Sequence, residues 1–499
     1  MSPADPPTEG VDGDTIRRNT ALSLVALVLP SLLTFGLTIY LVRALGPESF
    51  GVFALAMAIG LLLLLPSDLG LSQSAARYIA EHRSDAGRVA GVLSDALRLK
   101  LIGGLVVSIS LLLLAGPIAA AYDEPDLVWP LRGMALAVFA QGMMAYWNTA
   151  FVALRRVSLN LKVVLSESVA EVTASVALVA LGAGATGAAF GRAIGFGFGA
   201  LIALLLIYRL LGRNAVAVRG RGQGHVGRIA RYAGALVVID IAYSAFMSVD
   251  ALVIGALLDV EDVGLFQAPY RIVYALAILG LAFANGVAPR MSRTGTGPDV
   301  GAFLAATRYL LVLQTALAVT IAIWAEPIVD LVLGEDYEES VDVLRVLAVF
   351  AFVAGLSPLF SVSVNYLGEA RRRIPIAVAA VLLNLVLDVV LISEIGVVGA
   401  AIGTSLAMTF YAGAHFWLCE RIVSFSLLPL ALTLVRSLVA GAAMAGVLAA
   451  FAAWSVSIPA LVLAGLVASV VFVVVLVVLR ELSRAELAAA RAFVLRRLG

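Results

Sequence analysis

The stretch TALSLVALVLPSLLTFGLTIYLV, residues 20–42, contains no charged side chain and decides the class of this molecule. A helix needs about 20 predominantly apolar residues to cross a lipid bilayer. The stretch is longer than the core of a secretion signal, and no small-residue cleavage site follows it before Pro47, so we expect a retained membrane helix. The hydrophilic residues 1–19 that precede it predict a short, disordered cytoplasmic tail.

Similar apolar stretches follow one another through the rest of the 499-residue chain. The chain is 62% hydrophobic and 13% charged, with a mean hydropathy of +1.03, which lies outside the range of soluble domains. The sequence therefore predicts an all-α polytopic membrane protein with about fourteen transmembrane helices. The expected spans are residues 20–42, 50–72, 98–121, 128–153, 163–183, 187–208, 233–258, 264–288, 303–326, 341–366, 374–393, 399–419, 430–453 and 458–479.

Several classes of chemistry lack the residues that they require. Cys419 is the single cysteine, which excludes an intramolecular disulfide, a four-cysteine zinc site and an iron–sulfur cluster. Both lysines, Lys100 and Lys162, follow leucine, so the chain has no Gly-Lys-Ser/Thr phosphate-binding loop. The three histidines lie in distant segments. We therefore expect no cofactor, no metal site, no nucleic-acid partner and no enzymatic activity.

The distribution of arginine predicts the orientation in the membrane. Alternate connections carry the basic residues: Arg77, Arg83 and Arg88; Arg155 and Arg156; residues 209–231; Arg290 and Arg293; and Arg371, Arg372 and Arg373. These connections are expected to be cytoplasmic by the positive-inside rule. The other set, residues 46–50, 122–127, 259–263 and 334–340, contains acids and no lysine or arginine, so it is expected to face outward. Both termini are then cytoplasmic.

The C-terminal tail, residues 480–499, has the spacing of a helix start. Glu486 follows Ser483 by three residues, which is the spacing of a capping box. Apolar residues and arginines mix beyond it, a pattern that suits an amphipathic helix on the anionic inner leaflet. A frayed tail is the alternative.

Three pairs of segments recur at nearly one offset, which indicates an internal duplication. They are LGPESFGVF (45–53) with LDVEDVGLF (258–266), Arg98 and Pro117-Ile118 with Arg308 and Pro327-Ile328, and GAAFG (187–191) with GAAIG (399–403). Each copy contains an even number of spans, so the copies have the same orientation, which is the parallel-repeat architecture of secondary transporters. The expected parts are six-helix bundles at 20–208 and 233–419, a basic cytoplasmic linker at 209–232, and two additional helices within 420–479. Rocking of the bundles about a cleft would give alternating access.

Four motifs together resemble one family of transporters. They are LGPESFGVF (45–53), DLGLSQSAARYIA (68–80), VDALVIG (249–255) and VGLFQAPYR (263–271). In order and spacing they are similar to the polysaccharide-biosynthesis flippases of the multidrug/oligosaccharidyl-lipid/polysaccharide exporter superfamily. The resemblance implies a fourteen-helix carrier in a prokaryotic cell membrane. It further implies that a lipid-linked saccharide on polyprenyl phosphate or pyrophosphate moves to the outer leaflet, with membrane lipids and glycan-assembly enzymes as further partners.

Four arginines are candidate contacts for such a phosphate. Arg43 and Arg345 lie within about one turn of an outward helix end, and Arg192 and Arg271 lie roughly 8 to 10 Å deep at 1.5 Å per residue. A guanidinium group can hold phosphate oxygens bidentately and stays charged. The alternatives are snorkelling to the outer headgroups for the shallow pair and a helix-packing ion pair for Arg192.

Buried acids are candidate ion-coupling residues. Asp250 and Arg271 should lie at similar depth across a tight hairpin, so we predict that they pair. The pair Glu167 and Glu171 and the pair Asn384 and Asp388 are each spaced i,i+4, which places each pair on one helix face. Closely spaced acids in low dielectric would suit binding of H⁺ or Na⁺. Glu167 could instead reach the cytoplasmic interface.

Two other functions remain open at this stage. A cation-coupled drug or metabolite antiporter of the same superfamily would favour an acid-lined cleft for cationic solutes. A membrane-embedded glycosyltransferase or polymerase would be expected to carry a large outward loop, but no outward connection exceeds about 15 residues, the upper end of ordinary loop lengths.

Overall fold

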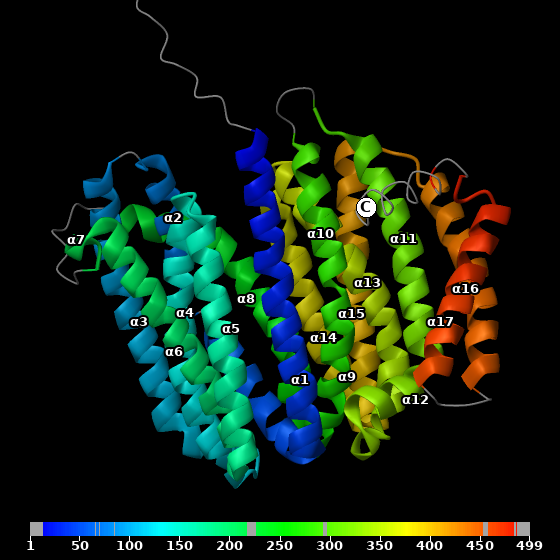
Figure 1. The fold of residues 1–499 in the computed structure, drawn as a ribbon, viewed down its shortest axis with the longest axis horizontal. Coiled ribbons are helices and arrows are strands. Elements are labelled where there is room, and N and C mark those ends of the chain that lie inside the picture. Colours follow the sequence, from blue (N-terminus) through cyan, green and yellow to red (C-terminus); the bar gives the residue numbers. More distant parts are fainter. Residues whose placement is uncertain are drawn as a thin grey trace, which may run out of the picture. The chain divides into compact units, whose positions relative to one another are not determined.

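The computed structural model describes residues 13–64, 66–68, 70–83, 85–216, 226–292, 297–452, 458–483 and 486. All regular elements within these residues are helices (Figure 1). The predicted all-α class is therefore confirmed. The first 12 residues, part of the linker (217–225) and nearly all of the C-terminal tail beyond 483 lie outside the described residues, and so do the predictions made for them.

The helices are long and follow one another with short connections. Their bounds are α1 Gly13–Leu64, α2 Leu71–Glu81, α3 Ala86–Ala121, α4 Val128–Ala153, α5 Val157–Leu178, α6 Gly184–Leu211, α7 Arg213–Val216, α8 Val226–Leu257, α9 Val260–Leu276, α10 Ile278–Val287, α11 Val300–Ile323, α12 Ala325–Ile328, α13 Ser340–Tyr366, α14 Arg373–Ile395, α15 Val397–Val423, α16 Leu428–Ala452 and α17 Ile458–Val478.

Each predicted span falls on a helical segment. Eleven segments of the described chain are long and apolar enough to cross a membrane, and two of these, Leu29–Leu64 and Val157–Leu211, overlap two predicted spans each. The shorter apolar segment Ile241–Leu257 accounts for the remaining one. The protein is therefore a multi-pass membrane protein, and the expected number of about fourteen crossings agrees with the helices.

Glycines with positive φ separate the two pairs of spans that share one continuous stretch. Gly46 has a φ of 71° inside α1, and Gly182 and Gly184 have φ of 88° and 52° between α5 and α6. A residue with a Cβ rarely adopts this conformation, so glycine allows each chain reversal with almost no loop. The kinks fall where the sequence predicted the turns at 42–50 and 183–187.

The described helices form two compact units. The first contains residues up to Ala44 and then Ile59–Val237, and the second contains Leu45–Ala58 and Val238–Gly499. Unlike the expected bundles, the second unit includes the segment Leu45–Ala58 and also the last two helices. The partner of Leu45–Ala58 there is the start of α9.

The contact of this segment with α9 is reciprocal. A Cβ added at Gly51 would lie 1.6 Å from the carbonyl oxygen of Val260, and one added at Gly264 would lie 2.0 Å from the carbonyl oxygen of Pro47. Val260 precedes Gly264 by four residues, just as Pro47 precedes Gly51. Each duplicated segment therefore presents the same glycine to the same position of the other, as at an isologous interface. This symmetry supports the duplication that was predicted from LGPESFGVF and LDVEDVGLF.

The last two helices pack on the second unit through an apolar core. Its members are Trp324, Ala440, Met444, Leu448, Ala464, Ala468, Phe472 and Leu476. The Trp324 indole donates a hydrogen bond of 3.2 Å to the carbonyl oxygen of Leu448, so its polar atom is satisfied inside this core. Small alanines on α16 and α17 allow close helix packing, and Figure 1 shows the two helices side by side.

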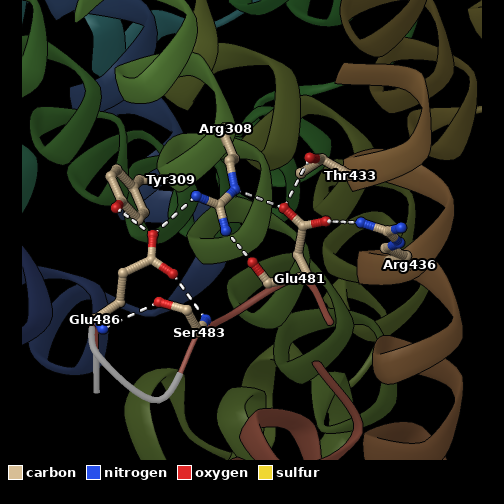
Figure 2. Close-up of polar contacts among 7 residues, drawn as sticks. All are labelled: Arg308, Tyr309, Thr433, Arg436, Glu481, Ser483 and Glu486. Atoms are coloured by element: carbon tan, nitrogen blue, oxygen red, sulfur yellow. Dashed lines mark hydrogen bonds and ion pairs between the residues drawn. The ribbon is translucent and has the colours of Figure 1, made fainter. Parts of the chain in front are cut away.

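A polar bracket joins the end of α17 to α11 and α16 (Figure 2). We define this C-terminal bracket as Arg308, Thr433, Arg436, Glu481 and Glu486. The Glu481 carboxylate is almost fully buried and accepts from Arg308 Nε at 2.7 Å, Thr433 Oγ1 at 2.8 Å and Arg436 Nη1 at 3.0 Å. Burial raises the pKa of Glu481, but these hydrogen bonds outweigh burial and leave the pKa below its ordinary value.

The predicted capping box is present at the start of the tail. The Ser483 backbone N–H donates to Glu486 Oε2 at 2.7 Å, and the Glu486 N–H donates to Ser483 Oγ at 3.1 Å. Arg308 Nη1 and the Tyr309 hydroxyl also donate to Glu486, at 2.9 and 2.8 Å. The Ser483 N–H, together with Arg308 and Tyr309, lowers the pKa of Glu486 to about 2. The sequence thus predicted the cap correctly.

Candidate functional site

Four polar side chains meet inside the second unit, on three helices. We call Asp250 of α8, Asn384 and Asp388 of α14, and Thr404 of α15 the acid cluster, and all four are fully buried. Asp250 Oδ1 accepts from Asn384 Nδ2 at 2.9 Å and from Thr404 Oγ1 at 2.5 Å. Asn384 Nδ2 also donates to Asp388 Oδ2 at 2.7 Å, so one amide links both carboxyl groups.

Other oxygens of the acid cluster have no hydrogen-bond donor among the described residues. They are Asp250 Oδ2, Asp388 Oδ1 and Asn384 Oδ1. The backbone of Gly403 passes very close to one of them, since a Cβ there would lie 2.5 Å from Asp388 Oδ1. Glycine at this position therefore keeps the space beside the Asp388 carboxylate open.

This arrangement has the chemistry of a site for a proton or a hard cation. Two buried carboxyl groups that interact with each other cannot both carry a charge without compensation. Carboxylate, amide and hydroxyl oxygens are the ligands that hard cations prefer. No group of three or more His, Cys, Asp or Glu side chains suited to a metal ion occurs within the described residues. A cation at the acid cluster would therefore also need the oxygens of Asn384 and Thr404.

Two pairs of equivalent glycine contacts show which part of the first unit corresponds to this site. A Cβ at Gly399 would meet Leu391 on α14, and one at Gly187 would meet Leu178 on α5. In the same way, Gly403 faces Asp388 whereas Gly191 faces Ser175. The hairpin α5–α6 is therefore the structural counterpart of the hairpin α14–α15, as the GAAFG and GAAIG repeat predicted.

In the first unit, the counterpart of the acid cluster contains its own cation. Arg192 follows Gly191 as Thr404 follows Gly403, and Glu171 precedes Ser175 by four residues as Asn384 precedes Asp388. Arg192 Nη1 forms an ion pair with Glu171 Oε1 at 2.8 Å. The arginine also lies 4.7 Å from the centre of the Phe196 ring. A fixed guanidinium group thus pairs with Glu171 in the first unit, whereas Asp250 and Asp388 of the second unit accept from an amide and a hydroxyl group.

The predicted pair Glu167 and Glu171 shares the buried face of α5. Both side chains are almost fully buried, and Ser168 Oγ donates to Glu167 Oε2 at 3.1 Å. Glycines of α6 pack on both residues, because a Cβ at Gly195 or Gly199 would overlap Glu171 or Glu167. Glu167 is therefore packed within the first unit and is not exposed.

The other arginine candidates lie in different surroundings. Arg271 is partly buried, and its Nη2 approaches Met57 Sδ at 3.5 Å. Arg345 forms an exposed ion pair of 2.7 Å with Asp342, one turn earlier on α13, and Arg43 is exposed on α1. Asp250 accepts hydrogen bonds from Asn384 and Thr404 of the acid cluster, and its pairing with Arg271 stays a prediction.

Some residues of interest were missed by the sequence analysis. Thr404 could have been found, because it follows the second repeat glycine at the position where Arg192 follows the first. Lys100 is buried and bonds to Asp68 Oδ1 at 2.5 Å, which braces α3 against the turn before α2. This pair is 32 residues apart in sequence, and no local pattern indicates it.

The described helices define a multi-pass membrane protein. The family model described as "Polysaccharide biosynthesis protein" matches residues 16–295, which is more than half of the chain, and the chain belongs to this family.

Two curated relatives match almost end to end. The "Putative O-antigen transporter" of Shigella flexneri is 22% identical over 82% of this chain and 99% of its own. The "Probable low-salt glycan biosynthesis flippase Agl15" of Haloferax volcanii is 25% identical over 88% of this chain and 90% of its own.

Solved structures share the fold. An inward closed form of the lipid II flippase MurJ aligns with a TM-score of 0.74 and 13% identity, covering 93% of this chain and 99% of that chain. An inward-facing multidrug transporter of the MATE family aligns with a TM-score of 0.59 and 16% identity, covering 81% and 98%. Both are transporters, and at these identities they establish the fold alone.

Proposed function

We propose that this protein is a flippase that moves a lipid-linked saccharide from the inner to the outer leaflet, for assembly of a polysaccharide or a glycoprotein glycan. The observation that carries the proposal is the nearly full-length similarity to two proteins named for O-antigen transport and glycan flipping. The alternative, a cation-coupled drug or metabolite antiporter, shares the fold. The names of the two curated relatives favour the flippase.

Removal of the protein from its cell tests this function. Without the protein, the cell surface should lack the glycan, and a polyprenyl-linked saccharide should accumulate in the cytoplasmic leaflet. Re-expression should restore export. Normal surface glycan together with a changed resistance to cationic drugs would favour the antiporter.

We propose that the protein couples transport to H⁺ or Na⁺ at the acid cluster. The support is the pair of fully buried carboxyl groups, Asp250 and Asp388, together with their undonated oxygens. The first unit supplies a contrast, because Arg192 already compensates Glu171 there. Asp388→Asn should remove the dependence of transport on the cation gradient. Unchanged dependence in that variant would place the coupling site elsewhere.

We propose that the phosphate of the substrate is held by arginines of the predicted set, Arg43, Arg192, Arg271 and Arg345, because a guanidinium group can hold phosphate oxygens bidentately and stays charged. Arg192 and Arg345 also bind the carboxylates of Glu171 and Asp342. Arg271, which is partly buried, is the arginine tested here. Arg271→Lys should keep part of the activity, because charge survives while bidentate geometry is lost, and Arg271→Gln should nearly abolish it. Full activity with Gln would refute this role.

The proposed setting is a prokaryotic cell membrane, with both termini in the cytoplasm. The support is the segregation of arginine into alternate connections. In this orientation the substrate is taken from the leaflet where glycan-assembly enzymes load the lipid carrier, so such enzymes are the proposed protein partners.

A further inference from the structure

Two tyrosines of the second unit, Tyr243 and Tyr274, are hydrogen-bonded to each other within membrane-spanning segments. Tyr243 of α8 and Tyr274 of α9 share a hydrogen bond of 2.7 Å between their hydroxyl groups. Their exposed fractions are 47% and 42%, and Tyr274 lies near the middle of the membrane-spanning segment Val260–Met291. The neighbouring Tyr270 differs, because it is buried, donates to Met247 Sδ and stacks on Phe266. Tyr270 packs the unit, and the ring of Tyr274 stacks on it with 6.1 Å between the ring centres.

A second group of polar residues continues from this pair. Arg373 at the start of α14 donates to Asn365 Oδ1 at 2.8 Å and to the Tyr411 hydroxyl at 3.3 Å. Arg373 Nε also donates to His415 Nε2 at 3.3 Å, and His415 Nδ1 contacts the Tyr411 carbonyl oxygen at 2.8 Å. His415 is therefore neutral, with its proton on Nδ1, and it fixes the direction of Arg373. Tyr411 lies within electrostatic range of Tyr243.

The heights of these residues along their helices form a series. At 1.5 Å per residue, Arg271 lies about 16 Å from the start of α9, and Tyr274 lies about 21 Å from it. Tyr243 lies about 21 Å from the end of α8, and Tyr411 about 21 Å from the start of α15. Arg373 lies about 33 Å from the end of α14, which is the full thickness of a hydrocarbon core. All of these helix ends belong to the predicted outward side.

We define the Arg–Tyr ladder as Arg271, Tyr274, Tyr243, Tyr411 and Arg373. Hydrocarbon is a poor environment for exposed hydroxyl and guanidinium groups, which in membranes normally face water, protein or a ligand. The ladder places a cation at each end and three phenol rings in between. A ring offers a flat apolar face, and a hydroxyl group both donates and accepts hydrogen bonds.

We propose that the Arg–Tyr ladder contacts the saccharide portion of the transported lipid. The C–H faces of sugar rings pack on Tyr243 and Tyr274, the sugar hydroxyls exchange hydrogen bonds with the phenols, and the arginine at one end of the ladder meets the anionic linkage. This inference rests on the proposed flippase function and adds the residues that recognise sugar as distinct from phosphate.

The test compares binding of two lipids that differ only in the sugar. Binding of polyprenyl pyrophosphate and of the same lipid bearing an oligosaccharide is measured on the full-length protein in detergent. Tyr243→Ala and Tyr274→Ala should each raise the Kd of the saccharide lipid by about two- to tenfold, the range for one aromatic contact. The Kd of the bare carrier should stay within about twofold. The Phe variants, which keep the ring, should fall between wild type and Ala.

Phe410→Ala is the matched control, because Phe410 is an aromatic residue of α15 with 40% exposure that neighbours Tyr411 outside the ladder. It should leave both Kd values unchanged, and thermal stability is recorded for every variant. Equal weakening of both lipids, no weakening of either, or a wild-type protein that does not distinguish the two lipids would overturn the ladder. Translocation of the saccharide lipid by wild type is measured separately, so failure of the flippase function is distinguishable from failure of the ladder.

Discussion

Replacement of Gly403 by alanine tests the acid cluster most selectively. The added Cβ would lie 2.5 Å from Asp388 Oδ1 and 3.3 Å from Leu387 Cβ, so α14 and α15 must separate or the carboxylate must turn. Overpacking of this kind costs about 1 to 3 kcal/mol, and the better helix propensity of alanine returns about 0.5 to 1 kcal/mol. We therefore expect a net loss of about 0 to 2.5 kcal/mol in the free energy of unfolding.

The same substitution should remove the stabilisation given by the coupling ion. A cation at 100 times its Kd stabilises the folded protein by about 2.7 kcal/mol. Thermal unfolding in detergent is measured for wild type and Gly403→Ala over a series of Na⁺ concentrations and, separately, of pH values. The wild-type protein should gain stability with one of these ions, and Gly403→Ala should gain little.

Gly413→Ala is the matched control on the same helix. A Cβ at Gly413 would have nothing within 4 Å, so this change should be neutral or slightly stabilising and should keep the full response to the ion. An undiminished ion response in Gly403→Ala would refute the assignment of the cation to the acid cluster. So would a wild-type protein that responds to neither ion.

Three further predictions concern the bracket, the repeat contact and the topology. Glu481→Ala should lower the free energy of unfolding by about 1 to 3 kcal/mol, after allowance for the partly exposed arginines. Arg436→Ala should lower it less in the Glu481→Ala background than in the wild-type protein. Because hydrogen bonds lower the pKa of Glu481, the bracket should stabilise at pH above about 4.5 and be lost as the pH falls below that value. Gly264→Ala should destabilise strongly, since its Cβ would overlap the Pro47 backbone, as measured by thermal unfolding. A cysteine at Asp336 should react with an impermeant thiol reagent in intact cells, in a background without the native cysteine.

Each of these has a control. Additive losses would show that Glu481 and Arg436 act independently. Gly286→Ala, whose Cβ would meet nothing within 4 Å, should be tolerated, and equal tolerance at Gly264 would contradict the close contact. Arg371→Cys should label only after the membrane is opened, and the reverse pattern would overturn the predicted orientation.

Hydropathy and glycine predicted the spans because both act locally. Twenty apolar residues cross a bilayer wherever they occur, and Gly46 marks a reversal by its own backbone freedom. Repeated glycines were equally informative, since Gly191 and Gly403 imply similar hairpins. Because the predicted spans give the helix ends, the depth of each residue in the membrane could be predicted from its distance to the nearest end.

The direction in which a residue faces could not be predicted in the same way. The pairing of Asp250 with Arg271, which have similar heights, stays a prediction, whereas the hydrogen bonds of Asp250 to Asn384 and Thr404, 134 and 154 residues away, were not predicted. Each residue turns by 100° about the helix axis, so a shared height leaves the partner undetermined. Glu481 is a similar case, because its partners Arg308 and Arg436 are 173 and 45 residues distant and no periodicity connects them.

The most direct test of the central claim is headgroup translocation by the purified protein in liposomes. The substrate is a fluorescent saccharide on polyprenyl pyrophosphate, and a membrane-impermeant quencher reports the leaflet in which the headgroup lies. We predict that wild-type protein moves the headgroup across the bilayer faster than protein-free liposomes and that an imposed H⁺ or Na⁺ gradient changes this rate. Movement no faster than in protein-free liposomes, while the same preparation transports a cationic drug, would contradict the account.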